Sequence, residues 1–380
     1  MIVYADAAAT TRISPAASRA MRDAEGLYGN PSSTHFVGQK SREAIEIARA
    51  QIAGCINAHP NEIFFTSGGS ESDNWAVYRG SVQHRGAAYS AIEHHAVSSA
   101  VCFYSAWHNV LKPNDIGVIE PETIRNLPNP VAGFISVMTA NNEIGTIQPI
   151  SELAYEAHRS NAIFHTDAVQ AVGHIPIDVK SMGVDMLSAS AHKFHGPKGV
   201  GFLYVRGGTA ILPYIIGGHQ ERNMRAGTEN VQGIVGMAAA LCDACARMPE
   251  TMATVREMRQ TLILGIMSSI PGAQYNGAPC QEDSLPGIVN FCFDGVDGET
   301  LVVLLSERGI MASSGSACMS GDREPSHVLT AIGRTDEQAR SALRISIDET
   351  NTDEEIDYIL KTLPVLVSYL RKASPKRSDP

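Results

Sequence analysis

Short apolar segments alternate with segments of helical spacing through the first two thirds of the chain. The apolar segments lie at 62–66, 87–92, 131–138, 163–167 and 184–189. This alternation predicts an α/β fold with a mostly parallel β-sheet between helices. Since ligands of such sheets bind at the carboxyl ends of the strands, polar residues at those ends are the first functional candidates. They are Glu93, His94, His95, Asn142, Asp167, Gln170 and Lys193.

Lys193 is the most informative of these candidates. It follows the segment 184–189 and is flanked by Ser190 and His192. Burial at a strand end lowers the pKa of a lysine amine and suits it to form a Schiff base with a carbonyl cofactor. An isolated motif of this kind is more often a solvated surface turn, so the interpretation depends on accompanying residues.

Two upstream residues favour the cofactor interpretation. Asp167 ends the preceding apolar segment, and a carboxylate there can keep the ring nitrogen of pyridoxal phosphate (PLP) protonated, as this cofactor requires. His94 follows an earlier strand, where an imidazole can stack on a planar ring and move protons. A histidine in such a place also often serves only as a hydrogen-bonded turn residue.

A phosphate site is predicted at 62–84. A strand at 62–66 is followed by a glycine-rich turn at 67–72 and a helix from Asp73 to His84. Free backbone amides and the helix dipole favour an anion there. The spacing matches neither the Walker nor the dinucleotide motif, so it favours a single phosphate.

The polar loop 217–230 leads into an alanine-rich helix. We expect Thr228 either to cap that helix or to offer its hydroxyl to a phosphate. Cys242 and Cys245 in the helix suggest a metal or redox site only weakly, because no second Cys or His pair follows nearby. We predict that Met248-Pro249 ends this helix and that a second helix runs from about 250 to 269.

The rest of the chain predicts a second lobe of strands and helices with two chemical candidates. Cys318 lies in the small-residue loop 313–325, where a thiol is accessible and its nucleophilicity depends on the charges that it approaches. An isolated loop cysteine more often has no chemical role. Arg344 is a lone charge in the apolar run 343–347, and its guanidinium can hold a carboxylate with two hydrogen bonds.

Composition limits the functional classes. The net charge is −10, which argues against general electrostatic binding of nucleic acid. No apolar run approaches the about 20 residues that span a bilayer, the N-terminus lacks the pattern of a signal peptide, and the seven cysteines are scattered. These features predict a cytoplasmic protein without membrane attachment.

Many ordered motifs resemble those of group I cysteine desulfurases of the NifS/IscS type, which are fold-type I PLP enzymes of the class V aminotransferase family. The resemblance runs from Tyr4 to the last helix. The motifs lie at 29–33, 65–72, 93–97, 141–149, 164–170, 190–199, 225–230 and 313–318. The sequence differs from the family pattern at Ala7, Ser70 and Met319, at Asp348-Glu-Thr350, and in its short tail.

The resemblance implies PLP as cofactor and a role for each site residue. Lys193 would hold PLP as a Schiff base, Asp167 would pair with the ring nitrogen, Gln170 with the ring hydroxyl, and His94 would stack on the ring. Cys318 would accept sulfur from L-cysteine as a persulfide, leaving alanine. The phosphate would be bound by Gly69, Ser70, Ser190, His192 and Thr228, the last from the other subunit of a homodimer. The substrate would be bound by Asn30, Asn142 and Arg344, and Asn142 would also contact the cofactor.

The implied architecture is a large PLP-binding domain at 14–255, with a seven-stranded type of sheet, and a smaller α+β domain. The smaller domain comprises 1–13 and 256–371 and carries the cysteine loop; 372–380 is a polar tail. The implied partners are a second copy of the chain and a sulfur-acceptor protein such as a cluster scaffold; no metal is implied.

Two other functions remain open from the sequence. One is a selenocysteine lyase or another PLP-dependent lyase on a cysteine-like amino acid, which would depend less on Cys318. The other is a non-catalytic thiol- or metal-binding partner in cluster assembly, built on Cys242, Cys245, Cys318 and the histidines.

Overall fold

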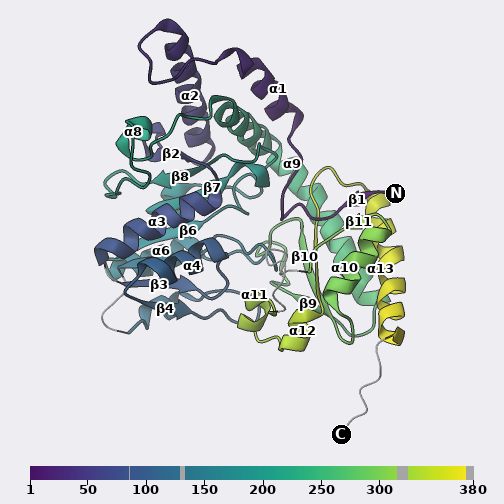
Figure 1. Ribbon diagram of the computed structural model, residues 1–380. Helices are drawn as coiled ribbons and strands as arrows, with labels where there is room; N and C mark the ends of the chain where they lie inside the picture. Colours follow the sequence, from purple (N-terminus) through teal and green to yellow (C-terminus); the bar gives the residue numbers. More distant parts are fainter. Residues whose placement is uncertain (85, 129–132, 315–323, 374–380) are drawn as a thin grey trace.

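A computed structural model describes residues 1–84, 86–128, 133–314 and 324–373 of the 380-residue chain (Figure 1). A seven-stranded sheet fills one lobe, and a smaller lobe contains both the N-terminal strand and the C-terminal helix. Cys318 and Met319 lie outside the described residues. The predicted α/β fold is confirmed.

The large sheet has the strand order β2-β8-β7-β6-β5-β3-β4. All neighbouring pairs are parallel except those of β8, which runs antiparallel to both β2 and β7. The strands are β2 (Ile63–Thr66), β3 (Gly86–Ser90), β4 (Trp107–Leu111), β5 (Phe134–Ser136), β6 (Ile163–Asp167), β7 (Met186–Ser190) and β8 (Gly201–Val205). The edge strand β4 has no counterpart among the predicted segments.

Helices cover both faces of this sheet because successive strand residues point to opposite sides. Phe134 belongs to the same hydrophobic cluster as Trp75 of α3, whereas its neighbour Ile135 belongs to a different cluster, which includes Ile52 of α2. The helices of this lobe are α1 (Pro15–Asp23), α2 (Phe36–Cys55), α3 (Gly69–His84), α4 (His95–Tyr104), α5 (Pro121–Arg125), α6 (Ile150–Arg159), α7 (Val179–Met182) and α8 (Gln220–Asn223).

The smaller lobe is built on an antiparallel sheet of order β12-β10-β9, beside the parallel pair β1-β11. Its strands are β1 (Val3–Tyr4), β9 (Ala273–Asn276), β10 (Ile288–Phe293), β11 (Ile310–Met311) and β12 (Ala342–Ser346). Its helices are α10 (Gly298–Glu307), α11 (His327–Ala331), α12 (Asp336–Arg340) and α13 (Asp353–Ala373). Pairing of β1 with β11 places the N-terminus in this lobe.

One long helix, α9 (Val231–Ser269), joins the two lobes (Figure 1). The prediction that Met248-Pro249 ends a helix was wrong, because α9 continues through Pro249. Proline removes one helical N–H donor, and packing of Met248, Met252 and Val255 on either side holds the helix together. By length and composition α9 could also span a membrane, but half of its most apolar stretch is buried inside the protein, as in a core helix.

The two halves of α9 pack in different hydrophobic clusters. Ile234 and Leu241 of α9 pack in the first cluster with the large sheet, and Val255 and Met258 pack in the second with Val3. This packing supports the division into a large domain at 14–255 and a small domain formed by 1–13 and 256–371, which stays a prediction.

Candidate functional site

Lys193 lies where the sequence predicts it, directly after β7 in a short 3₁₀ turn at Ala191–Lys193. Its Nζ atom donates hydrogen bonds to the carbonyl oxygens of Ala8 and Ala9, at 2.7 and 2.8 Å. The N-terminal segment of the small lobe therefore lies against the lysine. This arrangement holds the amine at the junction of the two lobes.

Asp167 and His94 lie close enough to Lys193 for their charges to interact. Asp167 ends β6, and burial raises the pKa of its carboxyl while the charges of His94 and Lys193 oppose that rise. His94 is the N-cap of α4, and burial lowers the pKa of its imidazole. A buried acid, a neutral imidazole and an amine thus share one site. Gln170 joins them by donating from Nε2 to the Ala8 oxygen at 2.8 Å.

The predicted phosphate-binding elements also meet at this point. A Cβ atom on Gly69 would lie 2.7 Å from the Val169 side chain and 3.6 Å from Ser190. The start of α3 therefore sits against the end of β7. His192 is adjacent, with Nδ1 3.1 Å from Thr10 Oγ1, and burial, with the charges of Lys193 and Lys198, lowers its pKa to about 4.

The helix that carries this site begins earlier than predicted. We expected the turn to extend to Ser72 and the helix to start at Asp73, but α3 starts at Gly69. Gly68 has a φ of +149°, a conformation that glycine adopts readily, so the chain turns within one residue. Ser70 consequently lies in the first turn of the helix, where free amides can bind an anion.

Arg344 occupies the lobe junction from the opposite side. It is 4% exposed, and it donates from Nη1 to the carbonyl oxygen of Asn142 at 3.0 Å and from Nη2 to Asp6 at 2.9 Å. Its Nε atom is buried with no hydrogen-bond partner among the described residues. A buried guanidinium with an unused donor suits a carboxylate ligand.

Two predicted site residues, Asn30 and Thr228, are not brought to Lys193 by this chain alone. Asn30 and Thr228 are exposed on two surface loops. Thr228 also does not cap α9, because the Asn230 side chain accepts from the Gly233 N–H and is the N-cap. Cys318 lies outside the described residues.

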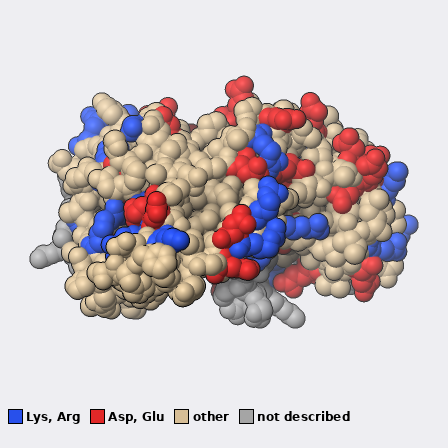
Figure 2. All heavy atoms as spheres, turned by 90° about the horizontal axis from the view of Figure 1, so that it is seen from above, with Lys and Arg blue, Asp and Glu red and all other residues tan. Residues whose placement is uncertain are grey.

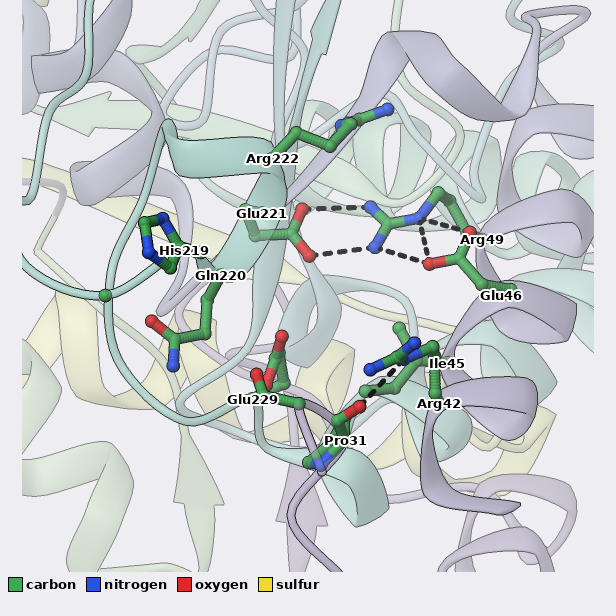
Figure 3. A pocket seen from close by; sticks show the side chains of 12 residues that line it. Pro31, Arg42, Ile45, Glu46, Arg49, His219, Gln220, Glu221, Arg222 and Glu229 are labelled. Carbon is green, nitrogen blue, oxygen red and sulfur yellow. Dashed lines mark hydrogen bonds and ion pairs between the residues drawn. The ribbon is translucent and has the colours of Figure 1, made fainter. Parts of the chain in front are cut away.

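The loops that carry Asn30 and Thr228 border a cavity of about 610 Å³ (Figure 3). A buried ion pair forms its floor: Arg49 of α2 donates two hydrogen bonds to Glu221, at 2.8 and 2.9 Å. Glu221 has a φ of +42°, which is unusual for a residue with a side chain. The ion pair therefore fixes the loop that leads to Thr228.

The sequence interpretation missed two members, Asp73 and His165, of a buried network beside the site. His165 Nε2 lies 3.7 Å from Asp73, and burial lowers the pKa of His165 to about 3. Burial and the Asp167 charge raise the pKa values of Asp73 and Glu93. These shifts favour the uncharged forms of all three side chains. Glu93, which lies just past a strand, was the member of this network that the sequence indicated.

A second group of charges lies two residues beyond Lys193. His195 has a φ of +63° and donates from Nδ1 to the Arg12 carbonyl oxygen at 3.0 Å, which leaves Nε2 facing Glu349 at 3.3 Å and Asp348 at 3.8 Å. Burial disfavours charge on His195, but the two carboxylates outweigh it and raise its pKa. Burial likewise opposes the charge of Glu349, yet His195 lowers that pKa to about 2.

We expect Glu349→Gln to destabilise the protein by about 1.5–3 kcal/mol, the range for hydrogen bonds to charged groups. The Glu349 contribution is complete above the ordinary carboxyl pKa of about 4.3 and is lost as the pH falls toward the folded-state value. The His195 contribution is complete below about 6.5 and is lost as the pH rises through its raised pKa. Unfolding midpoints should therefore differ most near pH 5–6, and an equal difference at all pH values would contradict this account. Glu307→Gln, an exposed control, should have little effect.

The residues around Lys193 fit PLP. An amine able to form a Schiff base, a buried carboxylate, a neutral imidazole and a helix N-terminus beside Ser190 and His192 offer each chemical part of the cofactor a matching group. Because Gly69 has no side chain, it can lie close to Val169 and leave the N-terminus of that helix open to a ligand.

The comparisons with known proteins agree with this site. The sequence profile of the aminotransferase class-V family matches residues 3–359. Cysteine desulfurase IscS of Clostridium botulinum is 44% identical, with 99% of this chain and 97% of the relative covered, and that of Methanosarcina thermophila is 44% identical, with 98% and 94% covered.

Solved structures give the same result. A NifS-like protein superposes with a TM-score of 0.90 at 37% identity, covering 97% of this chain and 100% of that one. SspA in complex with cysteine superposes with a TM-score of 0.79 at 34% identity, covering 91% and 99%. Members of these families use PLP. The chain therefore belongs to the aminotransferase class-V family and, within it, to the cysteine desulfurases of the NifS/IscS type.

Proposed function

We propose that this protein is a PLP-dependent cysteine desulfurase that converts L-cysteine to L-alanine and transfers the sulfur to Cys318 as a persulfide. The observation that carries the proposal is the convergence of Lys193, Asp167 and His94 at the carboxyl ends of neighbouring elements, opposite Arg344. The similarity to cysteine desulfurases over nearly the whole chain supports the substrate. The other functions considered from the sequence gain no specific support.

The cofactor would be held at both ends. Lys193 would bind it covalently through Nζ, and Asp167 would keep its ring nitrogen protonated. Gly69, Ser70, Ser190 and His192 would bind its phosphate, while Gln170 would contact the ring hydroxyl. When bound, PLP withdraws electrons from the amino acid and so makes its Cα proton acidic.

The chain's own residues would then move protons. The amine of Lys193 would take the Cα proton of the substrate. Its neighbours Ala8 and Ala9 supply the carbonyl oxygens that orient Nζ. His94 would stack on the ring, and because burial lowers its pKa it is neutral near pH 7 and able to accept a proton.

Sulfur transfer needs a nucleophile, and we assign it to Cys318. Its thiolate would attack the substrate sulfur, so that a sulfur–sulfur bond forms as the carbon–sulfur bond breaks. The electron pair of the broken bond stays with the carbon skeleton, which leaves as alanine after protonation. The persulfide would then be passed to an acceptor protein.

The proposal is tested by measuring alanine and sulfide from L-cysteine and a thiol reductant with the PLP-loaded protein. We expect equal amounts of the two products. Alanine without sulfide, or turnover of selenocysteine alone, would replace the desulfurase assignment with another PLP-dependent lyase. A protein that takes up no PLP would contradict the fold-based account of the site.

Arg344 provides a sharper test of substrate binding, since we assign it and Asn142 to the substrate carboxylate. Arg344→Lys should raise the KM for cysteine by roughly 10- to 150-fold, because a charge-assisted hydrogen bond contributes about 1.5–3 kcal/mol, while kcat falls less. Preference for cysteine over cysteamine, which lacks the carboxylate, should shrink by the same factor. If the preference for cysteine over cysteamine is unchanged and only the stability of the protein falls, the role of Arg344 is limited to its ion pair with Asp6.

We propose that the protein acts as a homodimer through the face that bears the cavity of Figure 3. Exposed apolar side chains lie on both loops that border it, Tyr28 at 83% and Ile216 at 81% exposed. On the face of the molecule seen in Figure 2, which includes the top of Figure 1, neutral residues cover broad areas between interspersed charges of both signs. A second copy on this face would bring its Asn30 and Thr228 toward the site that lacks them here.

The doubly substituted Tyr28→Asp/Ile216→Asp protein should dimerise roughly 30-fold more weakly or worse, since loss of a central apolar contact costs about 2 kcal/mol. Sedimentation equilibrium measures the change. Tyr369→Asp, at an exposed site on α13 (60% exposed), is the matched control and should not alter association. A monomeric wild-type protein would contradict the dimer proposal and leave the cofactor assignment untouched.

We propose a cytoplasmic location and a sulfur-acceptor protein, such as a cluster scaffold, as the partner. The six cysteines among the described residues carry free thiols, which supports a reducing compartment. Incubating the persulfide form with candidate acceptors and following transfer of labelled sulfur tests the second point.

A further inference from the structure

Three cysteine thiols meet between α2 and α9. Cys55 is the last residue of α2, and its Sγ atom lies 3.7 Å from Sγ of Cys242 on α9. Cys245, one helical turn further along α9, also contacts Cys55 through its side chain. All three are only half-buried. The sequence alone shows no nearby partner for Cys242 and Cys245. The fold brings Cys55, which precedes Cys242 by 187 positions, into contact with them.

We propose that Cys55 and Cys242 form a reversible, peroxide-sensitive dithiol site, in which oxidation joins α2 to α9 by a disulfide bond and Cys245 is the alternative partner. The observed sulfur separation exceeds the disulfide length of about 2.05 Å by an amount that side-chain rotation and a small shift of one helix can close. This inference is independent of the proposed desulfurase activity.

The three thiols differ in reactivity. The side-chain contact with Cys55, 3.7 Å between the Sγ atoms, lowers the pKa of Cys242 to about 7 against the opposing effect of burial. The same contacts raise the pKa of Cys55. Cys242 is therefore partly a thiolate at neutral pH and is the first to react, whereas Cys55 stays protonated beside it.

A cavity of about 280 Å³ adjoins the three thiols. Cys55 and Cys245 help to line it, and Cys242, which we expect to react first, is itself half-buried beside them. The remaining walls are chiefly apolar and include Ile56, Val172 and Leu241. Such a cavity admits a small uncharged molecule more readily than a charged one. Hydrogen peroxide or a small alkyl hydroperoxide fits this requirement.

The chemistry balances with peroxide as the oxidant. The Cys242 thiolate attacks one peroxide oxygen, so that a sulfur–oxygen bond forms, the oxygen–oxygen bond breaks and hydroxide leaves. Cys55 then attacks the Cys242 sulfur; the sulfur–sulfur bond forms, the sulfur–oxygen bond breaks, and the Cys55 proton leaves with the oxygen as water. Two thiols are oxidised by two electrons, and one hydroperoxide is reduced.

The experiment treats the full-length, PLP-loaded enzyme with a small excess of hydrogen peroxide, blocks remaining thiols by alkylation, and digests without reduction. We expect a linked peptide pair containing Cys55 and Cys242 in most chains, lost on treatment with dithiothreitol. Cys55→Ser should abolish the pair and leave Cys242 over-oxidised, and Cys242→Ser should divert Cys55 to Cys245. Cys280→Ser, at an exposed cysteine in another lobe, should change nothing.

A thermal readout complements the peptide analysis, because a bond that closes a loop of 187 positions restricts the unfolded chain. The oxidised enzyme should melt several degrees higher than the reduced enzyme, and the difference should vanish in Cys55→Ser. The proposal would be overturned if peroxide, at levels that oxidise the exposed Cys102, left Cys55 and Cys242 in separate peptides, either alkylated or over-oxidised.

Discussion

Lys193→Ala is expected to abolish desulfurase activity, with a loss of about a thousandfold or more. Removal of a positioned acid–base group alone costs about 10²–10⁴ in rate, and here the covalent link to the cofactor is lost as well. The visible absorbance of the bound cofactor should disappear, and borohydride should no longer attach the cofactor to the chain.

Two further variants separate the roles of the Lys193 amine. Lys193→Arg keeps a positive charge but forms no Schiff base, so it should be as inactive as Lys193→Ala. Lys198→Ala, at an exposed position in the same loop, should retain activity and colour. A Lys193→Ala protein that still turned over cysteine at more than a few per cent of the wild-type rate would exclude Lys193 from the central role.

Arg49→Met is expected to cause the largest loss of stability, about 3–5 kcal/mol, because it leaves the Glu221 carboxylate buried without its cation. Both side chains are 3–6% exposed, and Arg49 also donates to the Ile63 carbonyl oxygen at 2.9 Å. Glu221 accepts a further hydrogen bond from the Phe65 N–H at 2.9 Å. Chemical denaturation of the PLP-saturated protein measures the change.

The double variant Arg49→Met/Glu221→Leu distinguishes this cause from general disruption. Removal of both partners should recover part of the lost stability, since no buried charge is left unpaired. Arg42→Met is the matched control on the same helix. It loses one hydrogen bond, from Nε to the Pro31 carbonyl oxygen, and should cost about 1 kcal/mol or less. Equal destabilisation by both single variants would contradict the assigned importance of the buried pair.

The sequence predicted the part of the site that follows from local pattern. Lys193, Asp167 and His94 each follow an apolar segment, and parallel strands bring their carboxyl ends to one edge. Their meeting therefore required only the strand assignments. The resemblance to a known family added the cofactor and the roles of residues such as Gln170.

What the sequence did not predict depends on contacts between distant segments. Asp6 with Arg344 and Arg49 with Glu221 are joined only by tertiary packing, and no local pattern indicates the partner of either arginine. Pro249 misled the interpretation for the same reason, because packing by neighbouring side chains overrides the local preference of proline. Likewise, no pattern in the sequence indicates that Cys55 lies beside Cys242, because the two residues are 187 positions apart.

The central claim is that sulfur from cysteine passes through Cys318. The most direct measurement is mass analysis of the Cys318 peptide after the PLP-loaded enzyme is mixed with L-cysteine in the absence of reductant. We predict that this peptide gains the mass of one sulfur atom in step with the formation of one alanine per chain, and that Cys318→Ala forms neither persulfide nor sulfide while keeping its PLP. Alanine and sulfide formed at the wild-type rate by Cys318→Ala, or sulfur found on another cysteine, would contradict the account.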